Sequence, residues 1–480
     1  MKQRNFSHSI FYRIIIIIGL VVIVNIPCSS QNVNTDKIDE YILKRMQDRK
    51  IPGIAMAVIK NGTVIKEGYY GSGNLETNDP IIDSSVFEIA SMSKQFTCAA
   101  VLLLQQDGKI SINDKLSKYL DSLPFSWKNI TLEQLMNHTS GMRDDWDEPT
   151  PYFLANYTDS LMLIATKKVP LKFNSGTAFH YSSGPFILGL IIAKVSGVSI
   201  ADFLKNRIFD PLGMKTTSVY NNRTIVPHRV SGYVIKDSML MNGTDISPAA
   251  EARGDVGIIT SKPDMIRWAT ALQDDRLLNE ASRKAMFTQG KLSDGTYLSH
   301  GYGWFIYPYL NQIAIEHGGG FRTGFSSDIM IFPNKSLIII VFANLWTTGT
   351  FTMMTEIAGI VDAQFIKPSL RQPKNDPDKK RTEKLKDLIL DVAAKKWDDT
   401  QLNQQVNFGG FTALDLQEML KGFKNLLFIE EQNLKTNPLH LYGEKITKSI
   451  LYKIIAHRDS SYWLFGYNDK GKLVYAVPQD

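Results

Sequence analysis

The sequence predicts an α/β fold of the α+β type, in which an antiparallel sheet is flanked by helices and carries a helical subdomain. Strand patterns occur at both ends of residues 36–366, and helical patterns fill the middle of that segment. An antiparallel sheet formed from both ends, with a helical insert, is the economical arrangement of such a pattern. A polar stretch with three prolines at 367–380 predicts a linker. Residues 381–480 are long enough for a separate small α+β module.

The elements of the first segment follow from periodicity and turn residues. Asn61-Gly62 is a favoured tight turn and predicts a hairpin between its flanking apolar runs. The run 337–343 is long enough for a central strand. Residues 110–270 indicate short helices separated by long loops. The other expected elements are helices at 36–49, from Ser91 to Gly108, at 186–195 and at 352–365, and strands at 54–59, 63–70, 304–307, 313–315 and 325–344.

The C-terminal module mixes both kinds of pattern and carries no recognisable functional motif. We expect helices at 382–396 and 412–424, and strands at 447–457, 461–467 and 472–477. The module has no metal-ligand spacing and no phosphate-binding loop. Its aromatic residues fit a hydrophobic core as well as they fit a binding surface.

The first thirty residues predict a secretory signal peptide. Basic residues and no acidic ones accompany the apolar run 14–24, and small residues suited to cleavage follow it. The run is too short for an ordinary membrane-spanning helix. We therefore expect an exported protein, periplasmic or secreted. Retention of the segment as a membrane anchor and lipidation at Cys28 are the alternatives, and either would bring the protein to a membrane.

The composition is that of an ordinary globular protein. Of 480 residues, 44% are hydrophobic and 21% are charged, which is enough for a large core and several domains. The formal charge is +6, and half of it comes from three basic residues in the first thirty. We therefore expect no nucleic-acid partner. Cleavage after residue 30 would leave Cys98 as the only cysteine, so no internal disulfide is expected.

Ser91-Met-Ser-Lys94 is the most informative motif and the only Ser-x-x-Lys in the chain. Helical residues three apart share a face, so the Lys94 amine should lie beside the Ser91 hydroxyl. A serine hydroxyl becomes a good nucleophile only when a base takes its proton. The helix N-terminus also favours developing negative charge. The motif alone is short enough to arise by chance, so other residues must support it.

Two further loops supply candidates for the same site. Tyr181 lies in a turn-rich loop before a helix, and a phenol beside an ammonium group ionises more easily. The run His317-Gly318-Gly319-Gly320 lets a strand edge pass close to a ligand. Acyl transfer needs two N–H donors aimed at the oxyanion, and those of Ser91 and Gly320 are the candidates. The plainer interpretations are a half-buried tyrosine and an ordinary glycine-rich turn.

Metal chemistry has no support in the sequence. The eight histidines include no helical His-x-x-x-His pair and no Cys/His cluster. We expect no metal site.

Taken together and in this order, the motifs resemble those of the class C β-lactamase family. That family includes related penicillin-binding carboxypeptidases, D-aminopeptidases and esterases. The resemblance covers residues 36–366 and not the C-terminal module. It rests on Ser91-x-x-Lys94, Tyr181-x-Ser183 and His317-Gly318-Gly319, and on framework stretches at 91–97, 135–142, 208–214, 254–261 and 324–333.

The resemblance implies a fold and a set of roles. It implies a β-lactamase/transpeptidase-like sheet with the site beside a helical subdomain. Ser91 would be the acylated nucleophile, and Lys94 and Tyr181 would share the base role. Tyr181 would later protonate the leaving group. Ser183, His317 and the glycines after it would bind substrate, and no cofactor would be needed. His138 and Ser140 are similar to framework residues of the family.

Two departures from the family pattern concern the substrate. The second motif usually ends in Asn where this chain has Ser183, which shortens a contact to the substrate's acylamino group. The third motif of the lactamases usually begins with Lys where this chain has His317. A histidine is mostly neutral at neutral pH, and a hydrogen bond to a charged group contributes roughly 1.5–3 kcal/mol. Unless Arg322 compensates, we expect weak or no β-lactam turnover.

The function that these observations predict is an exported serine hydrolase acting through an acyl-enzyme on Ser91. The substrate would be an ester, an amide or a D-amino-acid peptide, including cell-wall fragments. A non-catalytic binding or scaffold protein with the same fold is one alternative, and a true β-lactamase is the other.

Overall fold

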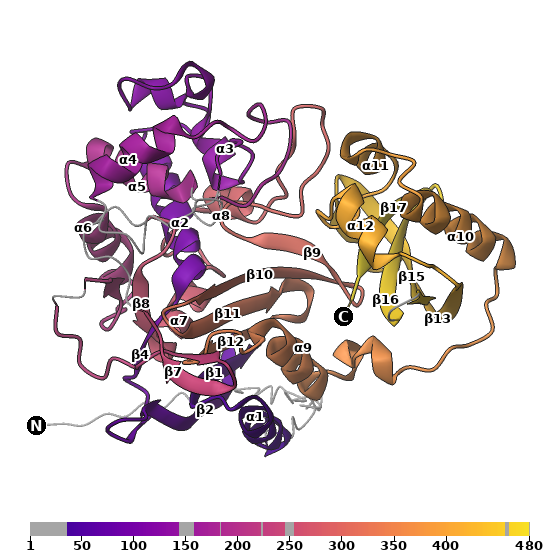
Figure 1. The fold of residues 1–480 in the computed structure, drawn as a ribbon, viewed down its shortest axis with the longest axis horizontal. Helices are drawn as coiled ribbons and strands as arrows, with labels where there is room; N and C mark the ends of the chain where they lie inside the picture. The colour runs from indigo at the N-terminus through magenta and orange to yellow at the C-terminus, as the bar shows by residue number, and fades with distance from the viewer. Residues whose placement is uncertain are drawn as a thin grey trace, which may run out of the picture. The chain divides into compact units, whose positions relative to one another are not determined.

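The computed structural model describes residues 36–143, 158–182, 184–221, 224–244, 254–456 and 460–479 (Figure 1). These residues belong to one compact unit, Asn34–Asp480. The predicted signal segment and Ser183 lie outside the described residues.

The central sheet has seven strands in the order β3-β2-β1-β12-β11-β10-β9. The N-terminal strand β1 pairs antiparallel with the late strand β12, from Ile54 opposite Ala343 to Lys60 opposite Leu337. The predicted sheet, built from both ends of the segment, is therefore confirmed. Its strands are β1 (Gly53–Lys60), β2 (Thr63–Asn74), β3 (Asp79–Pro80), β9 (Phe305–Tyr309), β10 (Gln312–Phe321), β11 (Phe325–Phe332) and β12 (Leu337–Ala343).

Helices cover both faces of this sheet, which explains why β11 and β12 are buried along their whole length. Helix α9 (Thr350–Val361) packs on β11 and β12, with α1 (Asp36–Arg49) beside it (Figure 1). Helix α7 (Lys262–Ala271) contacts β1 and β12 and packs on α2 (Ser93–Gln106). The rings of Phe96 and Trp268 join these last two helices at 4.3 Å between centroids.

Two predicted turns have the expected backbone. Asn61 and Gly62 have φ of +51° and +74°, as a tight hairpin turn between β1 and β2 requires. Gly108, with φ of +69°, follows the end of α2 and continues the chain in the left-handed conformation that glycine favours.

The middle of the chain is mostly helical but also contains strands that the sequence did not predict. The strands β4 (Val86–Glu88), β8 (Ile258–Ser261) and β5 (Ser218–Val219) form one small sheet, and β6 (Tyr233–Lys236) and β7 (Met239–Asn242) form a hairpin. Strands of two to four residues are too short to show a period. The helices are α3 (Leu132–Met136), α4 (Asp159–Lys168), α5 (Gly184–Ser196), α6 (Ile200–Leu204) and α8 (Glu280–Met286).

Within the described ranges, no single helix has both the length and the apolar character needed to cross a membrane. The bent pair Gly184–Ser196 and Ile200–Phe209, with 78° between its parts, meets those two criteria only when both parts are taken together.

The C-terminal module is a second antiparallel sheet with three helices. Strands run in the order β13-β15-β16-β17, and β14 pairs with β15. The short helix α11 and the strands β13 and β14 were not predicted, and the helix expected at 412–424 ends earlier. The elements are α10 (Lys379–Ala393), α11 (Asp399–Gln405), α12 (Ala413–Met419), β13 (Asn425–Asn433), β14 (Leu439–Leu441), β15 (Glu444–Ile455), β16 (Ser460–Asn468) and β17 (Leu473–Pro478).

This second sheet is buried on both faces. Tyr452 and Trp463 belong to a core formed with α10–α12. Leu451 and Tyr475 belong instead to the large core that contains the central sheet. The backbone N–H of Leu310, at the β9–β10 turn, also donates to Gln479 Oε1 at 2.7 Å. The apolar core therefore continues across the predicted linker, and the domain boundaries drawn from the sequence stay predictions.

Candidate active site

Ser91 lies in a 3₁₀ turn (Ala90–Met92) that leads directly into α2. Hydrogen bonds with β8 and with β11 hold the residue that precedes this turn. Ile89 donates its N–H to the Ile258 carbonyl at 3.0 Å, and its own carbonyl accepts from Ser327 Oγ at 2.9 Å. Ala90 has φ of +44°, a conformation that costs a non-glycine residue free energy and persists only where its surroundings enforce it. Ser91 is therefore held at a strained, partly exposed turn.

Lys94 is buried, with 3% of its surface exposed, and its side-chain nitrogen lies beside the serine. Its Nζ donates to Ser91 Oγ at 3.2 Å and to the Asp255 carbonyl at 2.9 Å. The juxtaposition predicted from the Ser-x-x-Lys spacing is thus present. Asp255 was not predicted as a partner, although its stretch belongs to the quoted framework, because a backbone carbonyl leaves no side-chain signal in a sequence.

Tyr181 comes to the same place from the loop before α5. Its ring lies 4.8 Å from Lys94 Nζ, a cation–π distance. The ring also stacks on that of His138, at 4.5 Å between centroids. His138 Nδ1 accepts the N–H of Ser182 at 3.1 Å, which fastens the loop that carries Tyr181. The expected framework role of His138 agrees with this contact.

His317 is buried on β10, with its ring 6.1 Å from that of Tyr181. Burial, reinforced by the nearby charge of Lys94, lowers the pKa of His317 to about 3. The ring is therefore neutral at neutral pH. Its Nδ1 lies 2.7 Å from the Gly318 carbonyl, which can only accept, so Nδ1 carries the proton. His317 thus differs from a lysine in having no charge to offer a substrate carboxylate.

The glycines after His317 bring the edge of β10 against the nucleophile turn. A Cβ on Gly319 would lie 2.1 Å from the Ile89 carbonyl oxygen, so only glycine fits there. A Cβ on Gly320 would meet nothing closer than Trp346 at 3.6 Å. The backbone of Gly320 therefore lies next to the turn that holds Ser91, as an oxyanion donor must.

A cluster of six rings lies behind Lys94 and excludes charge from that side of the site. The pKa of His138 lies well below its usual value, and that of His300 falls to about 3, in both cases mainly because of burial. His300 was not predicted as a site residue, and Phe305 was predicted only as part of the strand at 304–307. The rings are those of His138, Phe179, Tyr181, His300, Phe305 and His317.

Across the described residues, no three or more His, Cys, Asp or Glu side chains are grouped so as to hold a metal ion. The polar groups near Ser91 are those of acyl-transfer chemistry: a hydroxyl, an amine, a phenol and backbone N–H groups.

Comparison with known proteins identifies the family of the chain. The model of the Beta-lactamase family matches residues 38–360, which is well over half of the chain. The chain belongs to the β-lactamase family. That family consists of serine hydrolases related to penicillin-binding proteins and D-aminopeptidases.

Individual relatives are similar over the same part of the chain. Penicillin-binding protein 4* of Bacillus subtilis is 28% identical over 310 residues, covering 59% of this chain and 66% of the relative. A D-aminopeptidase of Brucella anthropi is 27% identical over 297 residues, covering 60% and 55%. A penicillin-binding protein of Bacillus halodurans has a solved structure with a TM-score of 0.58 and 26% identity, covering 67% of this chain and 99% of that one. This chain therefore spans less than two thirds of the length of the two curated relatives.

Proposed function

We propose that the protein is an exported serine hydrolase that forms an acyl-enzyme on Ser91. The observation that carries the proposal is the hydrogen bond from Lys94 Nζ to Ser91 Oγ, 3.2 Å long, at a strained turn. A buried amine in contact with a serine hydroxyl, and with an aromatic hydroxyl residue beside it, is an arrangement that can remove the hydroxyl proton.

The proposed reaction has two halves. Ser91 Oγ attacks the carbonyl carbon of the substrate while Lys94 and Tyr181 take up its proton. The oxyanion receives the N–H groups of Ser91 and Gly320, and Tyr181 returns the proton to the leaving group. Water, activated by the same pair, then releases the acyl group. No step needs a cofactor.

The substrate that we propose is an ester, an amide or a D-amino-acid peptide without an essential contact to a carboxylate. The neutral state of His317 supports this choice, because a lysine in its place would add a charged hydrogen bond of roughly 1.5–3 kcal/mol. One relative, from Brucella anthropi, is named as a D-aminopeptidase, and a peptidase cleaves an amide bond. Turnover of a β-lactam should accordingly be slow.

Labelling with a fluorophosphonate probe tests the nucleophile. The parent protein should be modified once, at Ser91, and a Ser91→Ala variant with the same melting temperature should remain unmodified. Folded parent protein that resists both this probe and a labelled penicillin would instead favour a non-catalytic binding protein. A substrate panel of short esters, D-alanyl amides and nitrocefin, each run beside Ser91→Ala, then separates esterase, peptidase and β-lactamase activities.

Export is a separate part of the proposal and rests on the basic leader and the apolar run 14–24. Expression in a bacterium followed by mass spectrometry of the N-terminus tests it. A mature chain that begins near residue 31 supports cleavage, whereas an intact or acylated N-terminus in the membrane fraction supports anchoring.

A further inference from the structure

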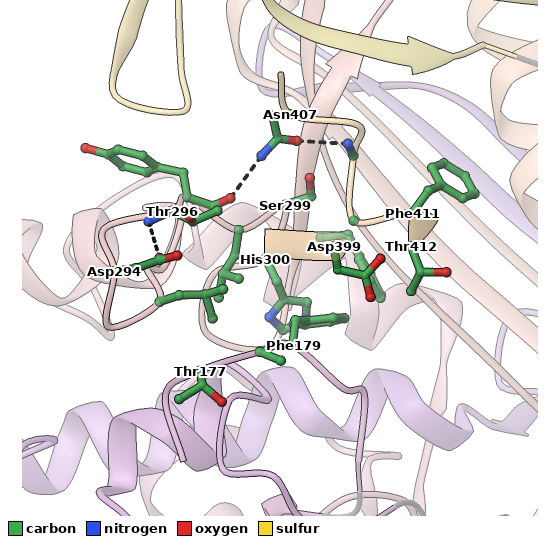
Figure 2. A pocket seen from close by; sticks show the side chains of 17 residues that line it. Thr177, Phe179, Asp294, Thr296, Ser299, His300, Asp399, Asn407, Phe411 and Thr412 are labelled. Atoms are coloured by element: carbon green, nitrogen blue, oxygen red, sulfur yellow. Dashed lines mark hydrogen bonds between the residues drawn. The ribbon is translucent and has the colours of Figure 1, made fainter. Parts of the chain in front are cut away.

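A cavity of about 280 Å³ lies between residues of the family domain and residues of the C-terminal module (Figure 2). The domain side consists of residues 177–179 and of side chains between Leu292 and Phe305. The module side consists of Asp399 and the loop from Asn407 to Thr412. The volume is near the lower limit of small-molecule pockets and accommodates a single ring-sized group.

The module side of the cavity is fastened to the domain by one side chain. Asn407 Nδ2 donates to the Tyr297 carbonyl at 2.9 Å, and Asn407 Oδ1 accepts the N–H of Gly409 at 2.8 Å (Figure 2). Gly409 and Gly410 have φ of +73° and +92°, which lets the loop turn sharply before Phe411. The loop that forms this wall of the cavity is therefore held in position by hydrogen bonds.

The cavity adjoins the proposed catalytic residues through two shared rings. His300 and Phe305 line it. The ring of Phe305 also stacks on that of Tyr181, 6.1 Å away and nearly parallel at 14°, and lies 5.7 Å from that of His317. Tyr181 is the residue proposed to protonate the leaving group, so a cavity separated from it by the single ring of Phe305 is placed to receive that group, although Tyr181 itself does not line the cavity.

The lining selects for a particular chemistry. Its interior is apolar and aromatic, with Phe179, Leu298, Phe305 and Phe411 among its members. Asp294 and Asp399 add two exposed carboxylates, and the lining includes no lysine or arginine from the part of the chain that the structure describes. His300 adds no charge, because burial lowers its pKa to about 3.

Each carboxylate is held in position by the backbone. One oxygen of Asp294 accepts the N–H of Thr296 at 2.9 Å, and one oxygen of Asp399 accepts that of Ala413 at 2.6 Å. Lys291 lies 4.3 Å from the Tyr297 ring centroid and is not part of the lining. The carboxylates therefore favour a positively charged group at the edge of an apolar pocket.

We propose that this cavity is a substrate subsite, completed by the C-terminal module, that binds an apolar or aromatic leaving group bearing a positive charge. The assignment of the cavity to the leaving group rests on the function proposed above. The module would thereby determine specificity, in addition to its contribution to the core.

A binding experiment tests the subsite independently of catalysis. Benzylamine is the probe, phenylacetate is the anionic probe of similar size, and the Ser91→Ala protein is the receptor. Ligand-observed NMR should detect benzylamine at millimolar concentration and phenylacetate at least tenfold more weakly. Phe411→Ala and Thr177→Trp, which open and fill the cavity from opposite sides, should each weaken benzylamine binding at least fivefold.

Leu414→Ala is the matched control for the binding experiment. Leu414 belongs to the same module, is 64% exposed and does not line the cavity, so binding should not change. Thermal melts identify a variant that fails to fold. If Phe411→Ala does not fold, the test rests on Thr177→Trp, which changes an exposed position. Undetectable benzylamine binding, binding insensitive to both variants, or equal binding of phenylacetate would each overturn the subsite.

A kinetic experiment tests its assignment to the leaving group. Two amides of D-alanine are compared, one releasing ammonia and one releasing a benzylamine that carries an aminomethyl group. Thr177→Trp should lower kcat/KM for the larger amide at least tenfold more than for the smaller one, and Leu414→Ala should lower neither. Equal losses on both amides would overturn the assignment. If fluorophosphonate labels Ser91 but benzylamine does not bind, the subsite is wrong and the proposed function stands. If benzylamine binds but fluorophosphonate does not label Ser91, the proposed function is contradicted and the cavity remains a binding site.

Discussion

A single methyl group at Gly319 should separate the nucleophile turn from the strand beside it. The added Cβ would lie 2.1 Å from the Ile89 carbonyl oxygen, and ordinary contact begins near 3.4 Å, so the two segments must part by about 1.3 Å. The Ile89 carbonyl cannot easily retreat, because Ser327 Oγ and the N–H of Met92 both donate to it. The edge of β10 has to move instead.

That movement would displace the Gly320 N–H from the proposed oxyanion position. Misplacement of a reacting group by about 1 Å costs roughly 10²-fold in rate, and loss of one oxyanion donor costs about 10²–10³-fold. We therefore expect Gly319→Ala to lower the rate of Ser91 labelling by a fluorophosphonate at least 100-fold. The same factor should apply to kcat/KM for the best ester of the panel.

Gly320→Ala is the matched control, since its Cβ would meet Trp346 at 3.6 Å and the Phe325 carbonyl oxygen at 3.7 Å, both ordinary contact distances, and its N–H is retained. Its loss should be at least tenfold smaller than that of Gly319→Ala. Both variants are first compared with the parent by thermal melting, because a clash in the sheet also destabilises the fold by roughly 1–3 kcal/mol. The reasoning is refuted if a folded Gly319→Ala variant labels within threefold of the parent, or if Gly320→Ala loses as much.

Three further predictions concern protons. Lys94→Arg keeps a positive charge that cannot be released at neutral pH, so Ser91 labelling should slow at least 100-fold; a rate within tenfold of the parent contradicts a base role. His300, with a folded pKa of about 3 against 6.5 when exposed, costs stability as the pH falls below 6.5, at about 1.4 kcal/mol per pH unit. Urea unfolding of His300→Gln between pH 6 and 4.5 should therefore show a slope shallower by that amount, and an unchanged slope contradicts it. Burial raises the pKa of Glu316 to about 7 and that of neighbouring Asp328 well above its usual range. The stability contributed by the protonated Glu316 carboxyl is complete below about pH 4.5 and is lost as the pH rises through 7, so Glu316→Gln should gain more free energy of unfolding relative to the parent at pH 8 than at pH 5. Equal gains at the two pH values would count against this sign.

The sequence predicted those parts of the fold that depend on long periodic runs and on turn residues with one strong preference. The pairing of β1 with β12 and the Asn61-Gly62 turn belong to this group. Short or half-polar strands escaped prediction. β13 ends in Glu430-Glu431-Gln432-Asn433, which carries no apolar alternation, and its pairing with β15 is set by partners distant in the chain.

For the site, the spacing of three residues was sufficient to predict Lys94 beside Ser91, although Ser91 lies in the 3₁₀ turn that precedes α2 and not in the helix itself. What the sequence could not predict are contacts made through backbone atoms or through rings from separate segments. The Asp255 carbonyl is an example of the first kind, and Phe305 stacked on Tyr181 is an example of the second. The loop at 407–412 beside the site also had no sequence signal, because its position depends on packing between two sheets.

The pairing of β1 with β12 has a consequence for how the chain acquires its structure during synthesis. β1 leaves the ribosome early, but its partner β12 is synthesised nearly three hundred residues later. Leu451 and Tyr475, which complete the large core, come later still. Contacts between such distant residues form slowly, because the intervening chain must first be ordered. The nucleophile turn at Ala90, whose strain depends on β8 and β11 from both sides, would then be among the last features to form. Under the proposed function, reactivity of Ser91 should therefore appear only after the C-terminal strands have been released.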